Sequence, residues 1–212
     1  MKPLMTETHD TDALADLGRA AVQIVHDLKN QINGLKLYAT FLRKRLEKGA
    51  GHADELETVA KLNAGLERAA ADMTTLVRYG RPVELRCAAQ VDLRRVLAAA
   101  LEREPETDAQ IVCHGEFDQA ALAEALKHID VGLQRAPRQA AAPPVRLKRE
   151  ADECVVEWRG VQTTNGDPFN SFAGSAGLRL ALAAKIIRAH GGRVEHEADA
   201  VRVCLPIMKD KG

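Results

Sequence analysis

Apolar residues recur along the first part of the chain at steps of three and four, the spacing of one face of an α-helix. In residues 10–48 the steps alternate, with one additional step of four after Ile24, as in a coiled-coil seam with a local stutter. Gly49 to Gly51 interrupt the pattern, and a second helical pattern follows in residues 52–79. The apolar positions are Leu14, Leu17, Ala21, Ile24, Leu28, Ile32, Leu35, Ala39, Leu42 and Leu46 in the first helix, and Leu56, Val59, Leu66, Ala70, Met73 and Val77 in the second.

These two helices are predicted to form a hairpin joined by a short turn that contains glycine. A hairpin of two helices cannot enclose a core by itself, so its apolar stripe needs another surface. Pairing with a second copy of the chain would build a four-helix bundle, and we therefore expect a homodimer. The alternative is that the hairpin folds against the rest of its own chain. The predicted helical domain covers residues 1–82.

The pattern changes after Gly80-Arg81-Pro82, which ends the second helix. Short strand-like stretches then alternate with shorter helices, and the predicted fold class is α+β, with a two-layer α/β sandwich over residues 83–212. Loops are expected at 136–144, which is rich in Ala and Pro, and at 161–173. Helices are predicted near 92–103, 118–135 and 175–190, and extended segments near 83–87, 111–113, 145–148, 154–158, 193–196 and 201–205.

Composition excludes several classes of function. Lys plus Arg and Asp plus Glu number 30 each, so the chain has no net charge to attract nucleic acid or an anionic membrane. No apolar stretch approaches the roughly 20 residues that cross a bilayer. The first residues lack the basic and apolar regions of a secretion signal. We therefore expect a cytoplasmic protein with neither nucleic-acid nor membrane partners.

The four cysteines, Cys87, Cys113, Cys154 and Cys204, lie far apart and form no CxxC pair. We expect them to be buried free thiols in a reducing compartment, without a disulfide or zinc framework. The histidines other than His26 show no ligand spacing, so no metal site is predicted.

The candidate for chemistry is His26, inside the first predicted helix. At about 100° per residue, His26 lies roughly 200° from the seam residues Ile24 and Leu28, so it is expected to face solvent. Lys29, Asn30 and Asn33 share its face, and Arg19 and Lys36 flank it.

A neutral imidazole is a competent nucleophile toward phosphorus when its second nitrogen is held. Asp27 is placed to orient the ring or accept its proton, and Asn30 to hydrogen-bond a phosphoryl oxygen or a water. Lys29 would supply positive charge beside a developing anion. A solvated polar face of a long helix explains the same residues equally simply, so physics alone does not single out this site.

The segment Ile24-Val25-His26-Asp27-Leu28-Lys29-Asn30 resembles the phospho-accepting H box of two-component histidine kinases, although Gln31 stands where many such motifs have Pro. Leu76 to Pro82, followed by Val91-Asp92-Leu93, is similar to the junction of the dimerisation and ATP-binding domains in that family. Gly177 to Leu182 and Ala189 to Gly192 resemble the end of the ATP-binding domain. The resemblance covers about residues 14–206 and implies a phosphoryl group carried on His26.

The resemblance fails at the metal-holding part of the nucleotide site. The family's N box places an Asn on a helix to hold Mg²⁺, and the matching stretch here is Leu122 to Ala136. The Asn position falls near Gly132, and Gln134 is the nearest amide. Asp130 would have to bind the metal in a different register.

Two further nucleotide motifs are also incomplete. Where the family presents an adenine-reading Asp and Gly-x-Gly, this chain has Trp158-Arg159-Gly160. Ser175 and Arg179 stand at positions that are usually Gly in the last glycine-rich box. Asp152 or Asp167 replacing the carboxylate, with Arg179 touching phosphate, is the remaining route to nucleotide binding. The three losses together argue against ordinary ATP binding, so no cofactor is expected on this chain.

The resemblance therefore implies a degenerate member: a cytoplasmic, bacterial-type histidine phosphotransferase in a phosphorelay. Such proteins receive a phosphoryl group from the Asp of one response-regulator receiver domain and pass it to another, and the receiver supplies Mg²⁺. His26, Asp27 and Asn30 would then form the catalytic group, and Arg19, Lys29, Asn33 and Lys36 would contact the partner.

Two alternatives stay open at this stage. The first is an ATP-dependent histidine kinase with a divergent pocket, which would phosphorylate His26 without any partner. The second is a non-catalytic dimeric scaffold or phosphatase for response regulators, which would act without carrying phosphate on His26.

Overall fold

The computed structural model divides the chain into two compact units. The first comprises Met1–Gly80 and Phe172–Ser175, and the second comprises Arg81–Ser171 and Ala176–Gly212. The structure describes residues 6–47, 52–107, 111–134, 142–161, 167–170, 172, 174–197 and 199–207.

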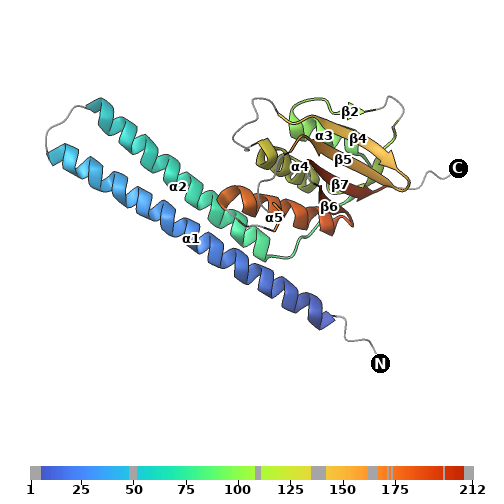
Figure 1. The fold of residues 1–212 in the computed structure, drawn as a ribbon, viewed down its shortest axis with the longest axis horizontal. Coiled ribbons are helices and arrows are strands. Elements are labelled where there is room, and N and C mark those ends of the chain that lie inside the picture. Colours follow the sequence, from blue (N-terminus) through green and yellow to red (C-terminus); the bar gives the residue numbers. More distant parts are fainter. Residues whose placement is uncertain are drawn as a thin grey trace. The chain divides into compact units, whose positions relative to one another are not determined.

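Two long helices, α1 (Thr6–Glu47) and α2 (His52–Gly80), form the hairpin of the first unit (Figure 1). The predicted turn at Gly49–Gly51 lies outside the described residues. The helices approach closely where Gly65 meets Leu35, since a Cβ atom at Gly65 would lie 2.7 Å from Leu35 Cδ2. A glycine in the middle of α2 costs helix propensity, and here the close approach of α1 explains it.

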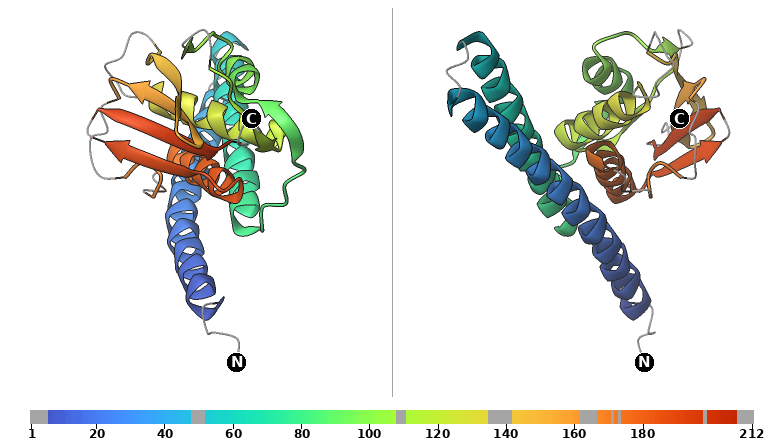
Figure 2. Two further views of the ribbon diagram at one scale, coloured as in Figure 1. Left: turned by 90° about the vertical axis from the view of Figure 1, so that its right-hand side faces the viewer. Right: turned by 60° about the vertical axis from the view of Figure 1, so that its left-hand side comes forward.

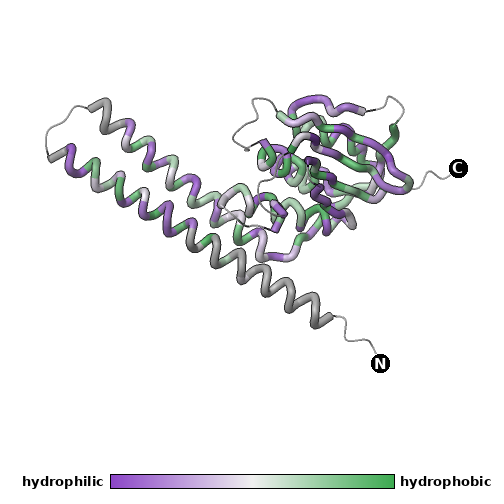
Figure 3. The backbone as a smooth tube through the Cα atoms, in the orientation of Figure 1, coloured by the Kyte–Doolittle hydropathy of each residue, from purple (hydrophilic) through white to green (hydrophobic). Residues whose placement is uncertain are grey.

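The hairpin leaves much of its predicted apolar stripe uncovered. Apolar and polar residues alternate along the coloured parts of both helices (Figure 3). On α2 the buried positions include Thr58, Ala69 and Asp72, whereas apolar residues on another side are exposed. The exposed set is Val59 at 39%, Leu66 at 56%, Met73 at 55% and Val77 at 51%.

In its described residues, the second unit is an α+β fold of three helices and two sheets. Its helices are α3 (Leu93–Leu101), α4 (Gln119–Gln134) and α5 (Gly174–Ala189), which begins in the segment grouped with the hairpin. The strands are β1 (Ala88–Asp92), β2 (Glu106–Thr107), β3 (His114–Phe117), β4 (Val145–Glu150), β5 (Glu153–Arg159), β6 (Arg193–Glu197) and β7 (Ala200–Pro206). A five-stranded sheet has the order β2-β4-β5-β7-β6, and β1 pairs with β3 in a small antiparallel sheet.

The core of this unit lies between the five-stranded sheet and the helices. Helices α3, α4 and α5 cover one face of the sheet (Figure 2). The central strand β5 is buried from Cys154 to Trp158. Leu126 and Ile129 of α4 and Leu182 of α5 are fully buried on the helical side. This is the two-layer α+β architecture predicted from the sequence.

Helix ends in the second unit are fixed by side-chain and backbone hydrogen bonds. Asp118 caps α4, because its carboxylate accepts the backbone N–H groups of Ala120 and Ala121, and it also accepts that of Arg86. These bonds hold the pKa of Asp118 below its ordinary value. Helix α5 ends at a left-handed Gly191 (φ +75°), which confirms the predicted helix stop.

The face of the sheet away from the helices carries a network of ion pairs. Side chains alternate along β5, so Glu157 points opposite to Trp158. Lys148 of β4 lies 3.6 Å from Glu157, and Arg202 of β7 lies 2.7 Å from Glu150 and 3.5 Å from Glu195. Burial opposes the ionisation of Glu157, but Arg159 and Lys148 outweigh burial and lower its pKa.

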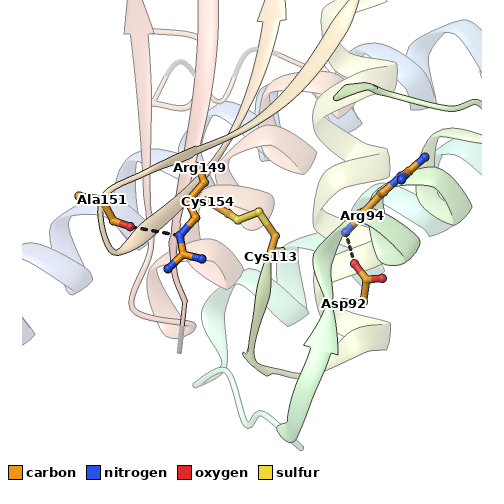
Figure 4. Close-up of a disulfide and its surroundings, with 6 residues drawn as sticks. All are labelled: Asp92, Arg94, Cys113, Arg149, Ala151 and Cys154. Atoms are coloured by element: carbon orange, nitrogen blue, oxygen red, sulfur yellow. Dashed lines mark hydrogen bonds between the residues drawn. A yellow bond between two sulfur atoms is a disulfide. The ribbon is translucent and has the colours of Figure 1, made fainter. Parts of the chain in front are cut away.

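A disulfide joins Cys113, just before β3, to Cys154 of β5 (Figure 4). The expectation of four buried free thiols is therefore wrong for this pair. Cys87 and Cys204 are free, but only Cys204 is buried as expected, since Cys87 is exposed. The two Cα atoms lie 6.0 Å apart, within the usual range for a disulfide. A separation of 41 residues gives no sequence signal for such a pair, since only the fold brings the two together.

The strands near the start of the second unit differ from the prediction. The extended segment expected at 83–87 is not a strand, and β1 begins at Ala88. The strand expected at 111–113 begins later, at His114, and β2 was not predicted. The strand was predicted too early because Ile111-Val112-Cys113 is an apolar run. The buried residues of β3 are Gly115 and Phe117. These short segments have too few alternating positions for a reliable boundary.

Candidate functional site

His26 lies inside α1, twenty residues after the first residue of the helix, so its backbone position is fixed by regular helical geometry. Its side chain lies outside what the structure describes, as does that of Arg19. Lys29, Asn30, Asn33 and Lys36 are all exposed on the following turns. This is the polar, solvent-facing stretch that the helical period predicted.

Asp27, next to the candidate phospho-acceptor, is partly buried within the first unit. Its Oδ2 atom accepts a hydrogen bond of 3.0 Å from the backbone N–H of Gly174. Gly174 has φ +65°, a left-handed conformation that suits glycine at the point where the chain turns into α5. Spacing could not predict this contact, because the two residues are 147 positions apart.

Gln31, which stands where many H boxes have Pro, contacts Asp72 of α2. Its Nε2 atom donates a 2.9 Å hydrogen bond to Oδ2 of Asp72, which is 5% exposed. Ser175 Oγ donates to the same Asp72 oxygen at 2.6 Å. Proline at position 31 would lack the amide that makes this link, so Gln31 ties α1 to α2 about one and a half turns after His26.

Asp130, the acidic residue of the divergent N box, is buried in the interior of the second unit. It is 4% exposed, and Arg103 donates to both of its oxygens at 2.9 and 2.6 Å. Trp158 Nε1 donates to Oδ1 at 3.0 Å, and Gln134 Nε2 donates to Oδ2. The carboxylate is therefore a structural ion-pair partner, and its oxygens do not point into open solvent as Mg²⁺ ligands would require.

Trp158 lies in the stretch where the histidine-kinase family has an Asp that binds adenine. Its side chain is fully buried on the helical side of β5, where its indole N–H reaches Asp130. A large aromatic side chain with a satisfied N–H stabilises the core between sheet and helix. It presents no carboxylate to a base.

Gly132, at the expected Asn position, lies directly against α5. A Cβ atom at Gly132 would lie 2.8 Å from Leu180 Cδ2 and 3.0 Å from Leu180 Cγ. Leu180 is 5% exposed, so it has little room to move away. A side chain larger than hydrogen at position 132 therefore requires the buried Leu180 side chain to move.

The two aspartates considered as replacements, Asp167 and Asp152, both lie in turns. Asp167 closes a local turn, because it accepts the backbone N–H of Phe169 and the side-chain amide of Asn170. Asp152 lies in the turn between β4 and β5, where its backbone carbonyl accepts from Ile207. Within the described residues, no group of three or more His, Cys, Asp or Glu side chains could hold a metal ion.

No model of a known protein family matches the chain, and no curated protein sequence matches it. Solved structures do match. The histidine kinase AdeS of Acinetobacter baumannii superposes with a TM-score of 0.58 at 13% identity, over 87% of this chain and 98% of AdeS. The histidine kinase ThkA, solved in complex with the response regulator TrrA, gives 0.70 at 16% identity over 95% of this chain. The chain has a histidine-kinase-like fold.

A third match, ShkA solved with AMPPNP, gives a TM-score of 0.54 at 16% identity. The chain spans 65% of the ThkA chain and 47% of the ShkA chain. At these identities the likeness concerns the fold, and the second unit matches the α+β fold of a histidine-kinase ATP-binding domain. Among the described residues, no helix is long and apolar enough to cross a membrane.

Proposed function

We propose that this chain is a histidine phosphotransferase that carries a phosphoryl group on His26 between response-regulator receiver domains. One observation carries the choice of a relay over a kinase: Asp130 of the N-box stretch is buried in an ion pair with Arg103 and hydrogen-bonded to Trp158. An ATP-dependent kinase needs a carboxamide or carboxylate to hold Mg²⁺ at the phosphates.

Gly132 independently supports the choice of a relay over a kinase. The Asn that would hold Mg²⁺ fits at this position only if the buried Leu180 side chain moves. The residues present do not fit a Mg²⁺–nucleotide site, and no step of the proposed reaction passes through ATP on this chain.

The proposed step is an in-line displacement at phosphorus. A ring nitrogen of His26 attacks the phosphoryl group of a receiver aspartyl phosphate, the new N–P bond forms, and the P–O bond to the receiver carboxylate breaks. The reverse step returns the group to the Asp of a second receiver. Mg²⁺ held by the receiver would neutralise the phosphoryl oxygens.

The groups around His26 have complementary roles in this proposal. Asp27, held by Gly174, would orient the imidazole or take its proton. Lys29 and Asn30 are exposed one turn further along and would contact the phosphoryl group. Arg19, Asn33 and Lys36 would contact the receiver. The ThkA structure is a complex with a response regulator, which supports a receiver domain as the partner proposed here.

The proposed functional form is a homodimer. Val59, Leu66 and Met73 follow one another at intervals of seven residues on α2 and are exposed by 39, 56 and 55%. Ile32 of α1 is 57% exposed. Burial of such a stripe against a second hairpin would complete a four-helix bundle, and each large apolar side chain would contribute roughly 1.5–3 kcal/mol.

Phosphoryl transfer from a panel of phosphorylated receiver domains tests the proposal. The purified chain should acquire label that is stable to alkali and labile to acid, the behaviour of a phosphorus–nitrogen bond. His26→Ala should abolish labelling, whereas His114→Ala, an exposed histidine of β3, should label normally. Label acquired from ATP–Mg²⁺ alone would instead support the kinase, and regulation that survives His26→Ala would support the scaffold.

A further inference from the structure

A cavity of about 210 Å³ opens between α4 and α5 of the second unit. It is lined by Lys127, His128, Val131, Gly132, Ala176 and Arg179. Val131, Gly132 and Ala176 form an apolar part of the lining, and the three basic residues supply its polar atoms. The proposed phosphoryl relay uses none of these side chains.

Among the described residues that line the cavity, the charged side chains are all basic. Lys127 is 3.1 Å from Glu102, but both side chains are exposed, so this pair is weak. His128 lies 4.0 Å from Glu124. Arg179 has no hydrogen-bond or ion-pair partner within the part of the chain that the structure describes. A concave site with a guanidinium group and a weakly paired ammonium group concentrates anions.

The size of the cavity limits the ligand. A protein cavity of about 150 Å³ holds one benzene ring, whereas pockets for drug-sized ligands measure about 300–1,000 Å³. A space of 210 Å³ therefore accommodates a single ring with one acidic substituent. It is too small for a complete nucleoside triphosphate.

We propose that this cavity binds a small organic anion, with its apolar body on Val131, Gly132 and Ala176 and its acidic group on Arg179 and Lys127. The guanidinium of Arg179 suits a carboxylate or phosphate group, which it can bind through two parallel N–H donors. Binding requires no metal ion, because the cationic side chains supply the charge. The cavity lies at the stretches where the resemblance placed the nucleotide, but its described lining offers basic side chains in place of Mg²⁺-holding groups.

The test uses the full chain and three one-ring probes: phenyl phosphate, benzoate and the neutral benzyl alcohol. In a titration followed by amide NMR, an anionic probe should bind saturably and shift the resonances of Val131, Gly132 and Ala176. Phenyl phosphate and benzoate distinguish a phosphate ester from a carboxylate as the preferred group. EDTA should leave the binding unchanged, and benzyl alcohol should bind at least tenfold more weakly.

Arg179→Ala should weaken the binding of the anionic probe about tenfold or more, since a charge-assisted contact is lost. Arg188→Ala is the matched control, because Arg188 is exposed on the same helix but outside the lining and should leave binding unchanged. If Arg179→Ala does not fold, Lys127→Ala provides the second variant and should also weaken binding. Thermal unfolding of each variant establishes that it is folded.

Three results would overturn the inference: no saturable binding of either anion, equal binding of benzyl alcohol, or equal losses in the Arg179 and Arg188 variants. Each of these leaves the phosphoryl relay on His26 untouched. EDTA-sensitive binding of ATP–Mg²⁺ that displaces the probes would also contradict it, and would at the same time contradict the proposed relay.

Discussion

Asp130 is the residue on which our proposal of a relay, and not a kinase, chiefly rests. In the sequence it was a candidate metal ligand in a shifted register, because an acidic residue near an N-box position permits that interpretation. In the structure its partners come from positions 103, 134 and 158, which no local motif connects. Periodicity predicts that position 130 lies on a helix, but the partner set of a buried carboxylate depends on tertiary packing.

Replacing Asp130 with Ala should lower the free energy of unfolding by about 3–5 kcal/mol, because Arg103 would be left beside a buried site without its counter-ion. Trp158→Phe should cost less, about 1–3 kcal/mol, since it removes one buried hydrogen bond and keeps a ring in the core. Urea unfolding measures both. Asp199→Ala, at an exposed carboxylate, is the control, and an equally small effect for Asp130→Ala would contradict the ion-pair assignment.

The lowered pKa values of Asp118, Glu150 and Glu157 predict a loss of stability in acid. A carboxyl group whose pKa is lower in the folded state stabilises that state fully above its unfolded pKa, about 4. This contribution disappears as the pH falls through the folded value. The free energy of unfolding should therefore decrease below about pH 4, and Glu157→Gln should reduce the slope. A stability that stays constant from pH 7 to 3 would contradict this account.

At the scale of elements, the helices were the most predictable part of the fold. The expected helices at 52–79, 118–135 and 175–190 correspond to α2, α4 and α5, because long apolar periods and glycine stops specify them. The short strands β1 to β3 were displaced or missed, since two to five residues cannot display a period. The predicted exposure of Lys29 and Asn30 holds, but the contacts Asp27–Gly174 and Gln31–Asp72 could not be read from spacing.

The disulfide between Cys113 and Cys154 links β5 to the segment before β3. It closes a long loop and should stabilise the folded unit by roughly 2–4 kcal/mol through the entropy of the unfolded chain. Urea unfolding with and without a dithiol reductant measures this contribution. Cys113→Ser should abolish the difference between the two conditions, whereas Cys87→Ser should preserve it. Equal stability of the oxidised and reduced forms would show that the disulfide contributes nothing.

At the scale of the whole molecule, the hairpin has more apolar surface than its own chain covers. Leu66 and Met73 are each more than half exposed and lie two helical turns apart. An interface on α2 is the simplest explanation of this pattern, and it was already expected from the sequence. How the interface pairs with its copy depends on packing that the period of one helix does not encode.

Leu66→Glu should convert the proposed dimer into monomers, because two carboxylates would enter the apolar centre of the bundle. Analytical ultracentrifugation measures the change. Glu67→Ala, at the adjacent exposed position, should leave the dimer intact. A wild-type chain that sediments as a monomer at micromolar concentration would contradict the four-helix bundle.

The most direct test of the central claim is the source of the phosphoryl group on His26. The chain is incubated in parallel with labelled ATP–Mg²⁺ and with a panel of phosphorylated receiver domains that includes a partner established by co-purification. The proposed relay predicts alkali-stable label from a receiver, none from ATP, and none in His26→Ala. Labelling of His26 from ATP alone would contradict the account, because the proposal rests on the interior position of Asp130 and on the contact of Gly132 with Leu180.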